Sequence, residues 1–233
     1  MKPLTAIAID GPAASGKTTV GRMLAETLEY LFLDTGCMYR AVTLAALQRG
    51  VDVMDETAVT QLAQSVDIDI QSSGNHGDGR AYTVLLDGED VTWAIRTPEV
   101  DGNVSQVSKY AGVRDQMVRQ QHLFGERGHV VAVGRDIGTV VMPEAALKLF
   151  ITATPEERAR RRTRDRREQG HAAEYDVILA DVKRRDAIDS NREHSPLRPA
   201  DDAVIMDSTG RTPADIVADI VAMLPAIRAL QEA

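Results

Sequence analysis

Residues 11–18 read Gly11-Pro12-Ala13-Ala14-Ser15-Gly16-Lys17-Thr18 and fit the pattern G-x-x-x-x-G-K-[ST] at every fixed position. An apolar run precedes this segment and an amphipathic pattern follows it, as expected for a loop between a strand and a helix. The glycines let the backbone wrap closely around phosphate, and successive N–H groups form an anion cradle. The segment therefore predicts a phosphate loop that binds a nucleoside triphosphate.

Two side chains of this loop have defined chemistry. Lys17 is expected to bring a positive charge to the β- and γ-phosphates, and the Thr18 hydroxyl is expected to bind Mg²⁺. The helix that begins near Lys17 adds the positive end of its dipole. The residues assigned to ATP binding are Gly11, Pro12, Ala13, Ala14, Ser15, Gly16, Lys17, Thr18 and Thr19.

Short apolar runs that alternate with helical patterns indicate the fold class. The predicted buried strands are residues 5–9, 31–33, 130–133, 147–151 and 203–206. Helical periodicity covers residues 18–28, 113–124 and 212–224, the last opening with Thr212 and Pro213. Because this alternation implies crossover connections, we expect an α/β fold with a parallel five-stranded sheet flanked by helices.

Two regions interrupt the alternation. Residues 66–91 show three short strand patterns, at 66–70, 81–86 and 89–91, and Asp87-Gly88 predicts a hairpin turn between the last two. We therefore expect a small antiparallel β insert. Residues 154–191 show two charged helices with few large apolar side chains, which is typical of a solvent-facing, mobile element.

Seven of the ten residues from Arg158 to Arg167 are arginine. Neighbouring acids offset some of them, but like charges four residues apart on a helix repel, so the excess needs another explanation. Phosphoryl transfer spreads negative charge that guanidinium groups stabilise. A mobile helix would deliver such groups only on closure, which also excludes water. We therefore expect one or two of these arginines to act from a lid; Arg158, Arg161 and Arg162 share one helix face.

Other polar groups follow the predicted strands directly. Gly134-Arg135-Asp136 follows residues 130–133, and Asp34-Thr35-Gly36 follows residues 31–33. Ligands of open parallel sheets bind beyond the carboxyl ends of strands, so this placement favours a functional role. Arg185, Asp189 and Arg192 would share one helix face, a spacing that fits an intrahelical ion-pair ladder equally well.

Composition excludes several classes of protein. A net charge of −8 argues against a generic nucleic-acid binder. No run of about 18 apolar residues and no secretory signal is present, so we expect no membrane association and a cytoplasmic location. The single cysteine excludes an internal disulfide, and the five histidines lack metal-ligand spacing. No Asn-Lys-x-Asp segment that would recognise guanine is present, which counts against a GTPase.

Several separated motifs together resemble the bacterial cytidylate kinase family, in order and spacing over about residues 6–224. The motifs are Ile9-Asp10-Gly11-Pro12, Leu33-Asp34-Thr35-Gly36, Met38-Tyr39-Arg40-Ala41, Gly134-Arg135-Asp136-Ile137-Gly138-Thr139 and Arg185-Asp186. The resemblance implies transfer of the γ-phosphoryl group of ATP to CMP or dCMP, with Mg²⁺, in pyrimidine nucleotide metabolism. We expect a monomer.

The same resemblance implies a division of the chain. Residues 1–35, 109–154 and 193–233 would form the core domain that carries the phosphate loop. Residues 36–108 would form a domain that binds the monophosphate and contains the β insert. Residues 155–192 would form the helical lid.

Roles carry over to matching positions. Ser105, Arg114 and Asp136 would read cytosine, whose amino group suits a carboxylate; uracil would leave that carboxylate unpaired. Arg185 and Asp189 would hold the ribose hydroxyls, and Arg40, Arg135 and Arg192 would clamp the CMP phosphate. Thr35 and Tyr39 complete the expected substrate site. The residues expected to act in catalysis are Lys17, Arg135, Arg158, Arg161, Arg162 and Arg192.

Val133 departs from the family pattern, which has an acid directly before the Gly-Arg-Asp triplet. That acid would lie where a Mg²⁺-bound water is held, and Asp34 and Asp10 are the nearest alternatives by strand position. Two other functions stay open. A small-molecule kinase of the same fold would not need the insert, Ser105 or Arg114. A module that binds ATP without turnover is supported only by Val133.

Overall fold

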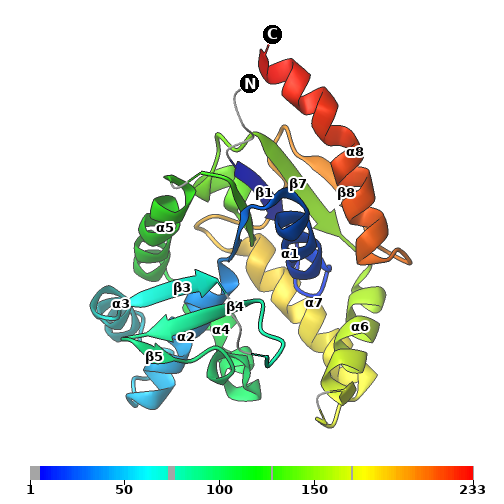
Figure 1. Ribbon diagram of the computed structural model, residues 1–233. Helices are drawn as coiled ribbons and strands as arrows, with labels where there is room; N and C mark the ends of the chain where they lie inside the picture. Colours follow the sequence, from blue (N-terminus) through cyan, green and yellow to red (C-terminus); the bar gives the residue numbers. More distant parts are fainter. Residues whose placement is uncertain (1–5, 73–76, 127, 169, 233) are drawn as a thin grey trace.

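The main sheet has five parallel strands in the order β2-β6-β1-β7-β8 (Figure 1). The structure is a computed structural model that describes residues 6–72, 77–126, 128–168 and 170–232. The strands are β1 Ala6–Asp10, β2 Leu31–Asp34, β6 Val130–Gly134, β7 Leu147–Thr152 and β8 Val204–Asp207. All five predicted strands are confirmed to within one residue at each described end; residue 5 lies outside the described residues.

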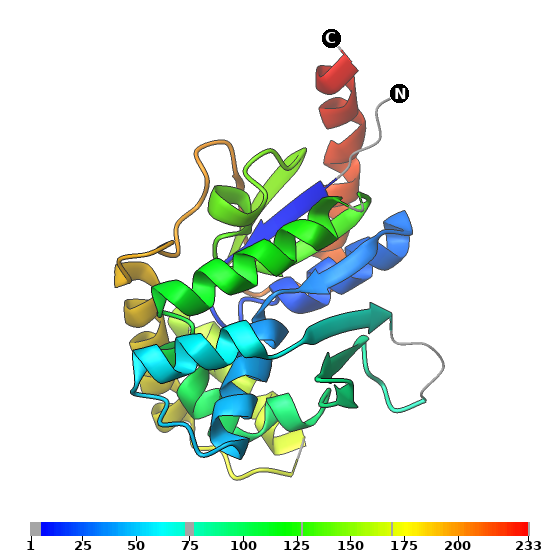
Figure 2. The same cartoon turned by 90° about the vertical axis from the view of Figure 1, so that its left-hand side faces the viewer.

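Helices cover both faces of this sheet (Figures 1 and 2). Side chains alternate along β1, so Ile7 and Ile9 enter one apolar cluster and Ala8 enters another. The first cluster contains side chains of α1 and α8, and the second contains side chains of α2 and α5. These helices are α1 Lys17–Leu28, α2 Gly36–Gln48, α5 Ala111–Glu126 and α8 Pro213–Glu232.

The helical patterns at residues 18–28 and 113–124 are confirmed as α1 and α5. The third pattern is confirmed as α8, but α8 continues through Pro225 to Glu232 instead of ending at residue 224. Pro225 thus lies within a helix although proline cannot donate a backbone hydrogen bond there.

The β insert is confirmed as a separate antiparallel sheet in the order β3-β4-β5. Its strands are β3 Ile68–Ser72, β4 Tyr82–Leu86 and β5 Glu89–Asp90. Asp87 and Gly88 both have positive φ angles, of 51° and 84°, as the predicted hairpin turn requires. Buried side chains of β4 join the apolar cluster that contains α2, so the insert packs beside the main domain (Figure 2).

Short helices flank the insert in the chain: α3 Glu56–Ser65, the 3₁₀ turn η1 Ala94–Arg96 and α4 Pro98–Val107. The Asp55 carboxylate caps α3 by accepting from Ala58 N at 3.0 Å. The Thr97 side chain caps α4, and Pro98 occupies the first turn. These elements belong to residues 36–108, which the sequence analysis assigns to monophosphate binding.

The two charged helices are confirmed as α6 Pro155–Glu168 and α7 Tyr175–Asn191. They lie side by side (Figure 1) around a small apolar cluster of Ala159, Ile178 and Val182. Their core is separate from the two clusters of the main domain, as expected for a distinct element. Within the described residues, no helix is long and apolar enough to span a membrane.

Helix α1 packs against β6 at Gly21. Val133 is fully buried, and a Cβ atom added to Gly21 would lie 2.4 Å from Val133 Cγ1. Only glycine at position 21 allows this approach. The first turn of α1 is thereby held against the end of β6, where the polypeptide leads into Arg135 and Asp136.

Candidate active site

The predicted phosphate loop connects the end of β1 to the start of α1. A Cβ atom at Gly11 would lie 2.0 Å from the Ile151 carbonyl oxygen, so only glycine fits there. Ala14 and Gly16 have φ angles of 59° and 90°, which curve the backbone ahead of the helix. The first N–H groups of α1 are free of intrahelical partners, as a phosphate site requires.

Lys17 is buried, and its ammonium group donates to the Pro12 carbonyl at 3.0 Å. Burial, followed by the positive charge of Arg135, lowers the pKa of Lys17 well below its usual range. An anion in the loop would counter both effects. The side chain is therefore placed to bind phosphate, and a bound anion would raise its pKa again.

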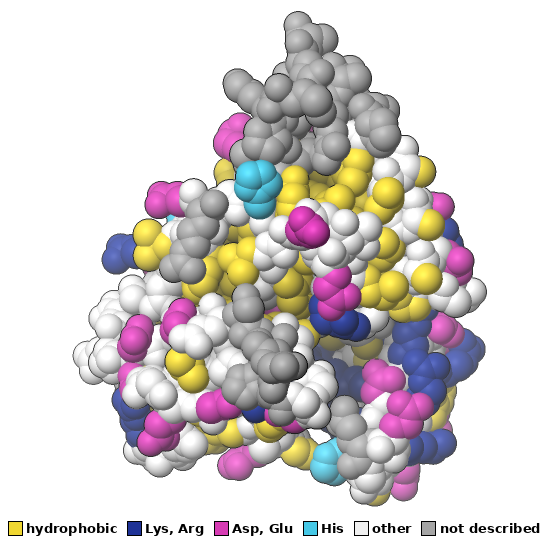
Figure 3. Space-filling model, viewed as in Figure 1, with side chains coloured by type: hydrophobic (Ala, Val, Ile, Leu, Met, Phe, Trp, Pro, Cys, Tyr) yellow, Lys and Arg dark blue, Asp and Glu magenta, His cyan; other side chains and the backbone are white. Residues whose placement is uncertain are grey.

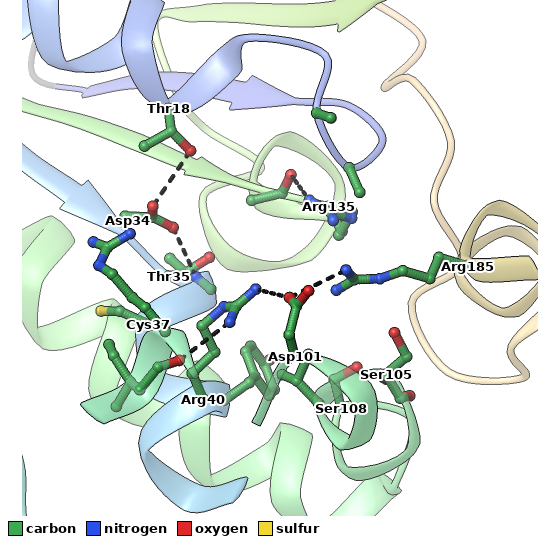
Figure 4. Close-up of a pocket in the computed structure, with 18 of the residues that line it drawn as sticks. Thr18, Asp34, Thr35, Cys37, Arg40, Asp101, Ser105, Ser108, Arg135 and Arg185 are labelled. Atoms are coloured by element: carbon green, nitrogen blue, oxygen red, sulfur yellow. Dashed lines mark hydrogen bonds and ion pairs between the residues drawn. The ribbon is translucent and has the colours of Figure 1, made fainter. Parts of the chain in front are cut away.

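Asp34 is the carboxylate beside Thr18 (Figure 4). The Thr18 hydroxyl donates to Asp34 Oδ2 at 3.3 Å, and the Tyr82 hydroxyl donates to the same oxygen at 3.1 Å. Gly36 N donates to Asp34 Oδ1 at 3.1 Å and fixes the orientation of the group. Hard oxygen ligands of this kind suit Mg²⁺. Clusters of three or more His, Cys, Asp or Glu residues that could hold a metal alone are absent from the described part of the chain.

Asp10, the other alternative, has a different role. Its carboxylate accepts from Ile137 N at 2.7 Å and Gly138 N at 2.8 Å, which anchors the π-helical turn η2 Ile137–Val141. Burial raises the pKa of Asp10 to about 6, despite these two hydrogen bonds. Val133 packs against α1, and so the polar environment of Thr18 is supplied by β2.

The phosphate loop opens into a cleft of about 430 Å³ that runs between the main domain, α4 and the α6–α7 pair. Figure 3 shows Lys and Arg side chains gathered in and beside this hollow. The expected site residues that line it are Ala13, Ala14, Lys17, Thr18, Thr35, Tyr39, Arg40, Ser105, Arg114, Arg135, Asp136, Arg162, Arg185, Asp189 and Arg192. The structure therefore brings most of the expected residues together from distant parts of the sequence.

The remaining expected residues lie around the loop and not along the cleft wall. Gly11, Pro12, Ser15 and Gly16 form the backbone of the loop itself, whereas the Thr19 side chain is exposed on α1. Arg158 is buried, donates to Ala13 O at 3.2 Å and makes two hydrogen bonds to Asp186. Arg161 donates to Ser15 O at 3.4 Å and to Ser208 O at 2.6 Å. Both arginines thus contact the phosphate loop from α6.

The deep end of the cleft contains a buried ion pair between Arg114 of α5 and Asp136. Arg192 Nη2 lies 3.7 Å from the other Asp136 oxygen. Arg114 also lies over the Tyr39 ring, 5.5 Å from its centroid. Ser105 is buried on α4 at the same end. A base would therefore meet a hydroxyl, a carboxylate and a guanidinium.

Several buried donors here lack a well-formed hydrogen bond to the protein. Among the described residues, Arg114 Nε, Arg185 Nε, Arg192 Nη2 and the Tyr39 hydroxyl make no hydrogen bond. Buried polar groups are normally paired, so such a concentration of unpaired groups at one cleft indicates a ligand with several acceptors. Burial raises the pKa of Tyr39 to about 12, which keeps its hydroxyl protonated.

The interpretation of Arg185, Asp189 and Arg192 as an intrahelical ladder is wrong. Helix α7 ends at Asn191, and the ion pairs of these residues reach other elements. Asp189 accepts from Arg135 Nε at 2.8 Å, Arg185 pairs with Asp101, and Arg192 pairs with Asp136. All three side chains are turned to the cleft because α7 forms one of its walls.

Neighbouring acids do offset the outer arginines of α6, as the sequence analysis considered. Arg160 pairs with Glu157, and Arg164 pairs with Glu168. Arg162 instead reaches across the cleft to Asp101. The excess of arginine is therefore explained by side chains that leave α6 for the loop and the cleft.

Sequence reasoning missed Asp101, Tyr82 and Arg96. Asp101 of α4 pairs with arginines from α2, α6 and α7. Arg96 Nη2 donates to the Tyr82 hydroxyl at 3.0 Å, and both side chains line the cleft. The helix cap at Thr97-Pro98 was a local signal for α4, but no local spacing links Asp101 to partners up to 84 residues away.

Comparisons with known proteins show the family of this chain. The family model described as cytidylate kinase matches residues 7–226. A cytidylate kinase from Chloroflexus aggregans is 51% identical over 212 residues, covering 91% of this chain and 90% of that protein. One from Bacillus pumilus is 46% identical over 221 residues, covering 95% and 96%.

The fold has also been seen in a protein of distant sequence. The crystal structure of an uncharacterized protein from Eubacterium ventriosum has a TM-score of 0.50 and 11% identity, covering 96% of this chain and 99% of that one. The family match extends over nearly the whole chain and includes both ends of the cleft. This chain therefore belongs to the cytidylate kinase family.

Proposed function

We propose that the protein transfers the γ-phosphoryl group of ATP to CMP or dCMP, giving ADP and CDP or dCDP. One observation carries the proposal: a single cleft contains the phosphate loop at one end and the buried Arg114–Asp136 pair at the other. Two nucleotides can therefore lie with their phosphates between the two ends. Family membership supports the same activity.

At the donor end, Lys17 and the N–H groups of the loop bind the ATP phosphates. Arg158 and Arg161 already contact loop carbonyls, so a small shift of α6 brings their guanidinium groups to the transferring phosphate. Planar donors that meet charge developing in the transition state lower the barrier. Closure of the lid formed by α6 and α7 excludes water, which would otherwise accept the phosphoryl group.

Mg²⁺ would be held by Thr18, with Asp34 as the adjacent carboxylate, and would neutralise charge on the ATP phosphates. The Thr18 and Asp34 oxygens are 3.3 Å apart, which suits a shared site for the ion and its waters. This arrangement supports turnover over a module that only binds ATP, because a carboxylate lies beside Thr18 although Val133 is not acidic.

At the acceptor end, Asp136 accepts a hydrogen bond from the cytosine amino group, and Arg114 and Ser105 bind the remaining polar edge. Asp189 and Arg185 bind the ribose, and Arg40, Arg135 and Arg192 hold the CMP phosphate. An oxygen of that phosphate then attacks the γ-phosphorus of ATP in line. The protein contributes position and charge neutralisation without a covalent intermediate.

A coupled assay over the nucleoside monophosphates tests the activity. We expect ADP formation to depend on CMP or dCMP, with kcat/KM for UMP and AMP about 100-fold lower, because a mismatched base leaves Asp136 unpaired. Equal rates with AMP would contradict the assignment of the base site. The pools of ATP and CMP lie in the cytoplasm, where we propose that the enzyme acts as a monomer.

A further inference from the structure

The Asp101 carboxylate pairs with four guanidinium groups inside the cleft. Figure 4 shows two of these pairs, with Arg40 and Arg185. Its Oδ1 atom accepts from Arg40 Nη2 at 2.6 Å and from Arg185 Nη1 at 3.4 Å. Its Oδ2 atom accepts from Arg162 and from Arg166 Nη2, the latter at 3.0 Å. The side chain is only 14% exposed. One carboxylate therefore occupies the centre of the most basic part of the cleft.

The charges around Asp101 are unbalanced. Asp181, 3.5 Å from Arg162, is the other carboxylate that pairs with one of the four arginines within the described residues. Four cations thus face two anions, and two of the cations are largely buried: the Arg162 and Arg185 side chains are 14% and 7% exposed. Burial opposes ionisation of Asp101, but Arg162, Arg40 and Arg185 lower its pKa well below the usual range. Asp101 is therefore charged at neutral pH.

A carboxylate in this position makes the contacts that a phosphate would make. Guanidinium groups recognise carboxylate and phosphate oxygens by the same paired N–H geometry. Arg40 is assigned above to the acceptor phosphate and Arg162 to the lid. Both now donate to Asp101, so an incoming phosphate meets donors that are already occupied.

We propose that Asp101 is a built-in competing anion: it pairs with Arg40 of the acceptor-phosphate site and with Arg162 and Arg166 of the lid, and the CMP phosphate must displace it. Asp101 therefore lowers the affinity for the acceptor nucleotide and limits binding of inorganic phosphate. This inference rests on the proposed function. The role of Asp101 adds to that function a residue that weakens substrate binding.

A merely structural ion pair predicts the opposite sign. If Asp101 only oriented Arg40 and Arg185, its removal would scatter these side chains and weaken CMP binding. If it competes, removal leaves four cations with one fewer anion, and the positive potential of the cleft rises. Phosphate then binds more tightly, because unit charges within a few ångströms interact strongly at the effective dielectric of a protein cleft.

The test compares Asp101→Asn with Glu99→Gln. Glu99 lies in the same first turn of α4 and is exposed, so its substitution removes the same charge from the helix end without touching the arginines. Calorimetric titration with CMP and with cytidine separates phosphate binding from base and ribose binding. Inhibition of the CMP reaction by inorganic phosphate gives a third readout.

We expect Asp101→Asn to lower the Kd for CMP about tenfold and to strengthen inhibition by inorganic phosphate by a similar factor. The Kd for cytidine should change much less, because Arg185 is the ribose contact that pairs with Asp101 and it does so at 3.4 Å. Asp101→Glu should keep the Kd close to that of the wild type, since the anion is retained, and Glu99→Gln should change nothing. An unchanged or higher Kd for CMP, or an equal change for CMP and cytidine, would overturn the proposal.

Two controls keep the outcome interpretable. Thermal unfolding shows whether Asp101→Asn folds, and Asp101→Ser, a smaller neutral side chain, replaces it if it does not. A wild-type enzyme that leaves CMP unphosphorylated contradicts the proposed function, whereas direct titration with inorganic phosphate still tests Asp101. If the wild type is active and Asp101→Asn binds phosphate with the same affinity as the wild type, only this inference is contradicted.

Discussion

Arg114 and Asp136 form an ion pair at the deep end of the cleft, with both side chains almost entirely excluded from solvent. Pairing cancels much of the cost of burying either charge, while Arg114 Nε still has no partner among the described residues. The carboxylate keeps further lone pairs for a ligand. The pair is therefore both a structural link between α5 and the end of β6 and the polar floor of a base site.

Replacement Asp136→Asn should change base preference. An amide can donate to uracil O4, whereas a carboxylate can only accept. We expect kcat/KM for CMP to fall about 100-fold and the CMP to UMP ratio to shrink, because Arg114 also loses its counter-ion. The coupled assay with both nucleotides measures this. Asp202→Asn, an exposed carboxylate beside Lys148, is the matched control, and an unaltered CMP to UMP ratio for Asp136→Asn would refute the base assignment.

Replacement Arg192→Ala should reduce kcat/KM for CMP about 100-fold or more, since a buried cation is removed from the proposed phosphate clamp. Arg192 Nε also donates to Ser195 O at 2.5 Å, so some loss of stability will accompany the change. Arg198→Ala removes an exposed arginine of the same segment and should have little effect. A wild-type rate for Arg192→Ala would show that this side chain is only structural.

Replacement Tyr82→Phe should raise the Mg²⁺ concentration needed for half-maximal activity about threefold to tenfold. The change removes the hydroxyl that donates to Asp34 and accepts from Arg96. Tyr110→Phe is a matched control, because the Tyr110 hydroxyl donates to Val53 O away from the cleft. Each variant should lose about 1 kcal/mol of stability. Titration with Mn²⁺, followed by its electron paramagnetic resonance, measures metal affinity without turnover. Identical metal affinity in both variants would exclude a role for Tyr82.

The raised pKa of Asp10 predicts a specific dependence of stability on pH. The pKa is about 6 in the folded protein and near 3.8 when unfolded, so the folded state binds more protons between these values. The free energy of unfolding therefore falls as pH rises from 4 through 6, by about 2 to 3 kcal/mol from this group. Denaturant unfolding of the wild type and Asp10→Asn at several pH values should show this slope only in the wild type. Parallel curves would contradict the assignment.

The sheet could be predicted because buried parallel strands are continuous apolar runs, and each of the five strands coincides with such a run. Helix α2 could not, because it is buried on most sides and carries apolar residues at nearly every position from Cys37 to Ala46, which hides the helical period. Helix α3 is short, and its signals are the Asp55 cap and the apolar face of Val59, Leu62 and Ala63. Tertiary packing, and not local periodicity, decides these elements.

The site was predictable where motifs carry it. The phosphate loop, Arg135 and Asp136 follow strands, and the parallel topology brings strand ends together. The partners of the arginines were not predictable, because ion pairs such as Arg40–Asp101 join residues 61 positions apart through the packing of α2 on α4. The packing of the helices decides whether an arginine side chain pairs with a carboxylate, donates to a carbonyl or is exposed to solvent.

The close packing of Gly21 against Val133 fixes the distance between α1 and β6. Lys17 and Thr18 begin α1, whereas Arg135 and Asp136 follow β6, so the distance from donor to acceptor depends on how closely helix and strand pack. That distance is set in the apolar interior by a hydrogen atom at position 21. The distance between the donor and acceptor residues thus depends on a position one helical turn after the phosphate loop. A search for variants that accept longer substrates should begin at this position.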